Sequence, residues 1–216
     1  MANLTNRRTF LTAGVVAAAL LVAPAALTLS APPAAAAPTA ADTLSGTWTP
    51  DKVHSDITFT VTHLAVNKVH GRFNDFDGTV VADGKKPSNS TVEFTIKTAS
   101  IDTGNTMRDN HLKSPDFFDV EKFPDITFKS TRVAKSGKGF VAEGNLTIHG
   151  VTKPVRLPFT VAGPVKGPGG SQHVGVETSL QINRRDYGLT WSNLVEGTAL
   201  VGDDVDIQIG LDLAKK

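Results

Sequence analysis

The sequence predicts an all-β fold: a sandwich or closed antiparallel barrel of about eight strands, interrupted by one short helix-containing connector. Three observations predict it. Almost every segment after Thr47 alternates apolar and polar residues with a period of two, as half-buried strands do. Turn-forming runs such as ADGKKPSNS, KSGKG and GPVKGPGGS separate these segments. Only residues 102–125 lack the alternation. Because each strand has a single apolar face, the strands must cover one another's faces around a common interior.

Residues in one phase of each segment are expected to point inward, because side chains alternate across a strand. The inward set comprises Ile57, Phe59, Val61, Val92, Phe94, Ile96, Ile126, Phe128, Phe140, Ala142, Leu146, Ile148, Val155, Leu157, Phe159, Val161, Val174, Val176, Leu180, Ile182, Val205, Ile207, Ile209, Leu211 and Leu213. Phe73 and Phe76 fall out of phase with each other, which predicts a bulge or a strong twist between them.

His63 lies in phase with Phe59 and Val61, so an imidazole is expected on the apolar side of its strand. Two explanations remain open. His63 is a hydrogen-bonded residue of a filled core, or the interior is a slot whose ligand has a polar end.

The connector is predicted to carry a helix over residues 105–113, which Pro115 ends. Three phenylalanines follow, Phe117, Phe118 and Phe123, in a stretch without strand alternation. They are expected either to plug one end of the barrel as ordinary core or to form a lid over the mouth of a cavity.

Residues 1–40 are predicted to be a cleaved export signal of the twin-arginine type. Arg7 and Arg8 precede an uncharged Ala/Val/Leu run and a zone of small residues, with cleavage expected between residues 36 and 41. A membrane anchor is disfavoured because the run is rich in Ala and broken by Pro24. Residues 41–216 are then a single domain, and the protein is expected in the periplasm or outside the cell.

Composition and motifs favour a binding protein over a catalyst. The chain has no Cys, and none of its six His residues forms an H-E-x-x-H pair, so no metal site is predicted. It has no G-x-S-x-G elbow and no phosphate-binding glycine loop. Its 22 Lys and Arg residues against 21 Asp and Glu residues give no basic excess for nucleic acid. An eight-stranded barrel with an apolar interior can hold one small ligand, so an apolar ligand is expected.

Three stretches in the same order resemble the YceI-like, polyisoprenoid-binding family from about Trp48 to Leu213. They read WTPDKVHSDITFTVTHLAVNKVHGRFNDFDGTV, MRDNHLKSPDFFDVEKFPDITFKST and GNLTIHGVTKPVRLPF. The resemblance implies a lipocalin-like antiparallel barrel whose interior holds a polyisoprenoid, an isoprenoid quinone or a similar amphiphile. It also implies export, frequent homodimers, no established enzymatic activity and no required cofactor. The chain departs from the family in its leader and in the loop at residues 167–170.

The resemblance carries individual residues over to this chain. The matching positions are His63, Arg108, His111, Phe117, Phe118, Phe123, Arg185, Asp186, Tyr187 and Gly188. Together with the inward phase, they predict a ligand-binding set of Ile57, Phe59, His63, Phe94, Ile96, Arg108, His111, Phe117, Phe118, Phe128, Leu146, Phe159, Val161, Leu180 and Ile182.

The expected function is that of an exported protein that carries or stores a long-chain amphiphilic lipid, with transient membrane contact. Two alternatives stay open at this point. One is an envelope enzyme that acts on a lipid through His63, His111 and Arg108. The other is a stress-related scaffold whose barrel is filled by its own side chains.

Overall fold

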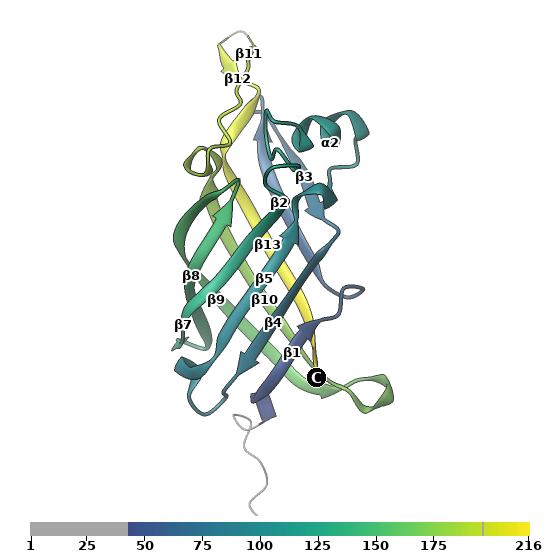
Figure 1. Cartoon of the computed structure of the whole chain (residues 1–216), viewed down its shortest axis with the longest axis vertical. Helices are drawn as coiled ribbons and strands as arrows, with labels where there is room; N and C mark the ends of the chain where they lie inside the picture. Colours follow the sequence, from purple (N-terminus) through teal and green to yellow (C-terminus); the bar gives the residue numbers. More distant parts are fainter. Residues whose placement is uncertain (1–42, 196) are drawn as a thin grey trace, which may run out of the picture. The chain divides into compact units, whose positions relative to one another are not determined.

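One antiparallel sheet, closed on itself, makes up most of the computed structural model, which describes residues 43–195 and 197–216 (Figure 1). The predicted leader lies outside these residues. The strands of this sheet are β1 (Gly46–Pro50), β2 (Asp56–His63), β3 (Asn67–Phe73), β4 (Phe76–Ala82), β5 (Thr91–Lys97), β6 (Ile101–Asp102), β7 (Asp125–Ser136), β8 (Gly139–Ile148), β9 (Val151–Lys166), β10 (Gln172–Asn183) and β13 (Val201–Lys215). A separate small hairpin consists of β11 (Leu194–Val195) and β12 (Thr198–Ala199).

Eight strands form the closed ring, in the order β1-β4-β5-β7-β8-β9-β10-β13 and back to β1. Every pairing in the ring is antiparallel, and four of the eight join strands that are consecutive in the sequence: β4–β5, β7–β8, β8–β9 and β9–β10. The predicted barrel class and strand number are therefore confirmed. Short connections suffice for these four pairs because antiparallel neighbours need only a hairpin, whereas residues 98–124 separate β5 from β7.

The long last strand, β13, closes the barrel. One edge pairs with β10, from His173↔Ala214 to Asn183↔Asp204. The other edge is shared by two strands: β1 pairs with the end of β13 and β2 pairs with its first part. The turn between β1 and β2 therefore lies directly against β13, where the amide of Asp51 donates to the carbonyl of Asp212 at 2.8 Å.

The predicted bulge between Phe73 and Phe76 is wrong. β3 ends at Phe73, where it pairs with β2 and β6, whereas β4 begins at Phe76 and pairs with β1 and β5. The two phenylalanines are out of phase because the alternation restarts in a new strand, and both side chains are buried. The register shifts lie elsewhere, in the pairs β9–β10, β13–β2 and β7–β8.

The end of the barrel that carries β1 and the carboxyl terminus lies opposite the end that carries the helix and the β11–β12 hairpin (Figure 1). Trp48 of β1 is only 1% exposed, and its indole N–H donates to the carbonyl of Leu44 at 3.0 Å. A buried indole with a satisfied donor is a stable filling for this end of the barrel.

The connector contains the predicted helix, α2 (Thr106–Lys113), within one residue of the expected start. The side chain of Asn105 accepts a hydrogen bond from the amide of Arg108 at 3.0 Å, which caps the amino-terminal end. The helix ends at Lys113, because Ser114, the residue before Pro115, takes an extended conformation. Among the described residues, no helix has the length and apolar character needed to span a membrane.

Candidate ligand-binding cavity

The barrel interior encloses a cavity of about 300 Å³, lined almost entirely by apolar side chains. Its lining extends from Trp48 and Leu213 at one end to Leu112 and Leu189 at the other, and all eight strands of the ring contribute to it. This volume lies at the lower limit of the range usual for small-molecule pockets. A barrel interior that is not completely filled can therefore receive one slender apolar group.

All the apolar members of the predicted ligand-binding set line this cavity. They are Ile57, Phe59, Phe94, Ile96, Phe117, Phe118, Phe128, Leu146, Phe159, Val161, Leu180 and Ile182. Period-two alternation placed the strand residues correctly because each strand of the ring keeps one face toward the interior. Their contact with a ligand stays a prediction.

His63 is not among the residues that line the cavity. It is the last residue of β2, half-buried, and pairs in register with Asn67 and Val201. Leu64 and Ala65 follow with positive φ angles and turn the chain into β3. The phase of the strand was assigned correctly, but the strand ends at His63, so the imidazole lies at the rim of the interior rather than within the apolar lining.

Arg108 and His111 also lie outside the lining, on α2. Arg108 donates two hydrogen bonds to Thr103: Nε donates to the hydroxyl at 2.7 Å, and Nη2 donates to the backbone carbonyl at 2.9 Å. His111 instead pairs through Nε2 with Asp116 at 2.9 Å. Arg108 and His111 therefore have separate partners, and no contact among the described residues joins either side chain to His63.

Three aromatic rings meet where the connector approaches the strand end after β10. The ring centroids of His111 and Phe117 are 5.0 Å apart, those of His111 and Trp191 are 5.0 Å apart, and those of Phe117 and Trp191 are 5.1 Å apart. Phe117 also lines the cavity and is 8% exposed. The cluster thus joins the helix connector to a distant segment at one end of the cavity.

The other two connector phenylalanines differ from each other. Phe118 lines the cavity and packs edge-to-face on Phe73, with ring centroids 5.9 Å apart. Phe123 is absent from the lining and packs on His149, with centroids 4.4 Å apart. The connector therefore contributes Phe117 and Phe118 to the cavity, while Phe123 anchors the connector to the β8–β9 turn.

Arg184 lies at the same end and was missed by the sequence prediction, which singled out its neighbour Arg185. Its side chain is buried, lines the cavity and donates to the carbonyls of Gly202, Leu189 and Trp191 and to the carboxylate of Asp203. Burial lowers the pKa of this guanidinium, and Asp203 opposes that effect. Arg184 and Arg185 are adjacent in the sequence, and no local pattern shows which of the two is buried.

Comparisons with known proteins agree with this architecture. The model of the family described as "YceI-like domain" matches residues 48–213. The chain belongs to the YceI-like family. A UPF0312 protein of Serratia proteamaculans is 43% identical over 137 residues, which cover 63% of this chain and 71% of that protein.

Solved structures resemble this YceI-like barrel as a whole. Burkholderia cenocepacia BcnA matches with a TM-score of 0.66 and 26% identity, over 76% of this chain and 98% of BcnA. The Campylobacter jejuni YCEI protein matches with a TM-score of 0.62 and 32% identity, over 77% and 96%. A polyisoprenoid binding domain from Saccharophagus degradans shares the fold, with a TM-score of 0.57 and 15% identity over 78% and 98%.

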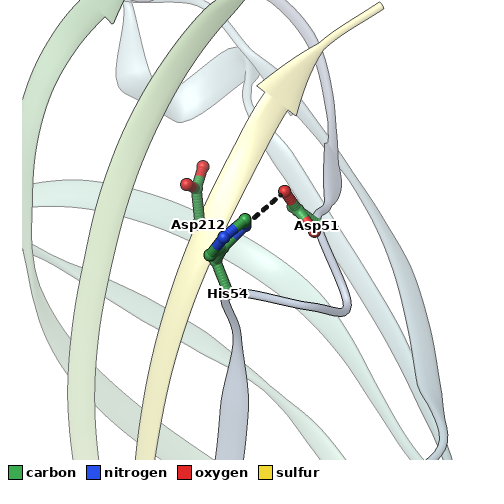
Figure 2. Close-up of side chains that lie close together, drawn as sticks. All are labelled: Asp51, His54 and Asp212. Atoms are coloured by element: carbon green, nitrogen blue, oxygen red, sulfur yellow. Dashed lines mark hydrogen bonds and ion pairs between the residues drawn. The ribbon is translucent and has the colours of Figure 1, made fainter. Parts of the chain in front are cut away.

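The YceI-like barrel also carries a polar cluster on its outer side, at the seam where β1 and β2 meet β13. Figure 2 shows Asp51, His54 and Asp212, whose potential ligand atoms all lie within 4.8 Å of one another. Carboxylates and imidazoles are ligands for transition metals. The groups already have partners, however: His54 Nδ1 pairs with Asp51 at 2.8 Å, and Asp212 pairs with His173 Nδ1 at 2.7 Å.

None of the three residues lines the cavity, so the cluster stabilises the seam rather than the ligand site. The hydrogen bond and the charge of Asp51 raise the pKa of His54 above its ordinary value of 6.5. His54 binds a proton more tightly in the folded state, so the pair's contribution to stability is complete below about pH 6.5 for as long as Asp51 stays ionised. It is lost as the pH rises through the higher folded-state pKa. The contribution is small because the imidazole is exposed.

We expect Asp51→Asn to return the pKa of His54 toward its ordinary value, because the charged acceptor is removed. An NMR titration of the histidine ring signals measures this directly. Asp116→Asn is the matched control, since Asp116 pairs with His111 instead. An unchanged His54 pKa in Asp51→Asn would show that the ion pair does not form in solution.

Proposed function

We propose that this protein binds a long-chain isoprenoid or a similar amphiphilic lipid inside the barrel and serves to carry or store it. The single observation that carries the proposal is the apolar cavity of about 300 Å³ that extends along the barrel. Membership of the YceI-like family supports the proposal, as does the shared fold of a polyisoprenoid binding domain.

The chemistry of the lining suits an apolar chain with a polar group at its end. Within the part of the chain that the structure describes, the charged residues that border the cavity are Asp83 and Arg184. Thr58 and Thr178, which also border it, direct their hydroxyls to the carbonyls of Gln208 and Pro158. Each methylene that leaves water for such a lining contributes about 0.8 kcal/mol. A lipid headgroup is therefore expected at one end of the cavity, with the chain between the sheet walls.

Export, membrane contact and a homodimer belong to the same proposal. The order of charged, apolar and small residues in residues 1–40 supports export. Exposed apolar side chains at the α2 end, Met107 and Leu194, support transient contact with a membrane. Amino-terminal sequencing of the exported protein tests the leader, and a mature chain that begins at Met1 would contradict it. Vesicle flotation tests the membrane contact, and sedimentation tests the homodimer.

Native mass spectrometry of the purified protein is expected to detect a co-purified lipid. Ala142→Trp should abolish uptake of that lipid, because Ala142 faces the cavity from β8 and a tryptophan there would block it. Asn145→Trp is the matched control, since Asn145 is an exposed residue of the same strand. Unchanged lipid binding by a folded Ala142→Trp variant would contradict a lipid site at this level of the barrel.

Phe117→Ala is expected to weaken lipid binding more than it destabilises the lipid-free protein. Truncating a phenylalanine in a filled core costs about 3–5 kcal/mol. Phe117 borders the cavity, so part of its contact surface is free until a ligand covers it. Denaturant titrations and lipid-binding isotherms on the same variants measure both effects.

Phe123→Ala is the control for this comparison, because Phe123 packs on His149 outside the cavity. It should lower stability and leave lipid affinity unchanged. A loss of several kcal/mol of lipid-free stability in Phe117→Ala with intact affinity would show that the connector is a plug of the core rather than a lid.

A further inference from the structure

Three glycines of the barrel wall occupy inward-facing positions. Gly71 lies between Val69 and Phe73 in β3 and Gly78 between Phe76 and Val80 in β4, each in the phase of the lining. Gly144 occupies the same phase in β8, between Ala142 and Leu146. A side chain at any of the three positions would project into the interior.

A phenylalanine from the neighbouring strand covers each glycine. Phe59 and Gly71 are direct partners in the β2–β3 pairing, and Phe94 and Gly78 are direct partners in the β4–β5 pairing. A methyl group added at Gly78 would lie 2.6–2.7 Å from three atoms of the Phe94 ring, far inside van der Waals contact. The Phe94 ring therefore lies flat over the backbone of β4.

The other two pairs show the same arrangement. A methyl group at Gly71 would collide with the tip of the Phe59 ring and would also lie 2.9 Å from Cγ2 of Thr103. One at Gly144 would lie 2.7 Å from Cζ and 2.8 Å from Cε2 of Phe128, and would also meet the carbonyl of Lys129. Each ring thus fills the space that a side chain on the next strand would otherwise take.

The direction in which the rings lean determines the space between them. Phe94 and Phe128 are direct partners in the β5–β7 pairing, so their side chains start from adjacent points of the wall. Phe94 leans over Gly78 of β4, and Phe128 leans the other way over Gly144 of β8. The two rings therefore diverge from each other, and both line the cavity.

We propose that Gly71, Gly78 and Gly144 determine the width of the cavity by receiving the rings of Phe59, Phe94 and Phe128. The inference rests on the proposed function and specifies its ligand: a slender, flexible chain, such as a linear prenyl or acyl chain, fits between the rings. A rigid fused-ring lipid does not, because a cavity of about 300 Å³ cannot widen without displacing these phenylalanines.

Gly78→Ala tests the proposal most directly, because all three of the nearest atoms belong to the Phe94 ring rather than to backbone. The added methyl group should turn the ring into the cavity. Losing contact with two or three methylenes of the ligand weakens binding of cis-parinaric acid, a fluorescent long-chain fatty acid, about tenfold or more. Gly175→Ala is the control: its methyl group would face outward and meet only Ala162 at 3.7 Å.

The double variant Gly78→Ala/Phe94→Leu should restore the binding that Gly78→Ala loses, because the smaller side chain no longer collides with the methyl group. If Gly78→Ala fails to fold, the double variant still tests the proposal. Removing the collision between the methyl group and the Phe94 ring should then restore folding. A folded Gly78→Ala variant with wild-type affinity, or a double variant that recovers neither folding nor binding, would overturn the proposal.

Two further measurements separate this inference from the proposed function. The wild-type protein should bind cis-parinaric acid and not dehydroergosterol, a fluorescent sterol; equal binding of both would overturn the assigned ligand class. A wild-type protein that binds neither probe would count against lipid binding itself. In that case, the crystal structure of Gly78→Ala still decides the width inference: a Phe94 ring that stays over β4 contradicts it, and a ring turned into the cavity supports it.

Discussion

The pairing of β13 with three other strands is the constraint on which the rest of the structure depends. One edge of β13 follows β10 along nearly its whole length, and the other edge holds β1 and β2 in succession. These pairings close the sheet into a barrel. The apolar face of the sheet is therefore turned inward, away from water, and no second layer packs against it. The interior must then be filled by the side chains of one sheet, and they leave a cavity along it.

The two ends of this interior are built differently. Buried Trp48 fills the β1 end, with its indole donor satisfied by the chain that leads into β1. The α2 end is made from segments that are far apart in the sequence: the connector, the strand ends around Arg184, and Trp191. Arg184 holds three backbone carbonyls and one carboxylate there, so this end is ordered by polar contacts and covered by aromatic rings. The cavity is therefore an apolar space between two ends of unlike chemistry.

Whether such a barrel is a container or a filled core depends on how its large side chains lie. Eight strands give an interior that side chains alone can fill. In this barrel, the rings of Phe59, Phe94 and Phe128 lie against glycines of neighbouring strands, and the Phe94 ring lies flat on Gly78. The outer seam, with Asp51, His54 and Asp212, contributes only exposed or half-buried polar contacts and leaves the interior unaffected. The fold therefore separates the contacts that close the barrel from those that shape its lumen.

The sequence alone determined the class of fold, the strand number and the apolar lining, because a period of two directly encodes which side chains share a face. It also located α2, whose cap and terminating proline are local signals. Other features were decided only by the tertiary structure. His63 lies at the rim because of where β2 ends, and Phe73 and Phe76 belong to strands with different partners. Arg184 is buried because carbonyls up to 18 residues away converge on it, and Phe94 lies flat because its partner across the sheet is a glycine. These outcomes depend on which distant residues meet, and that is set by the register of the closed sheet rather than by any local pattern.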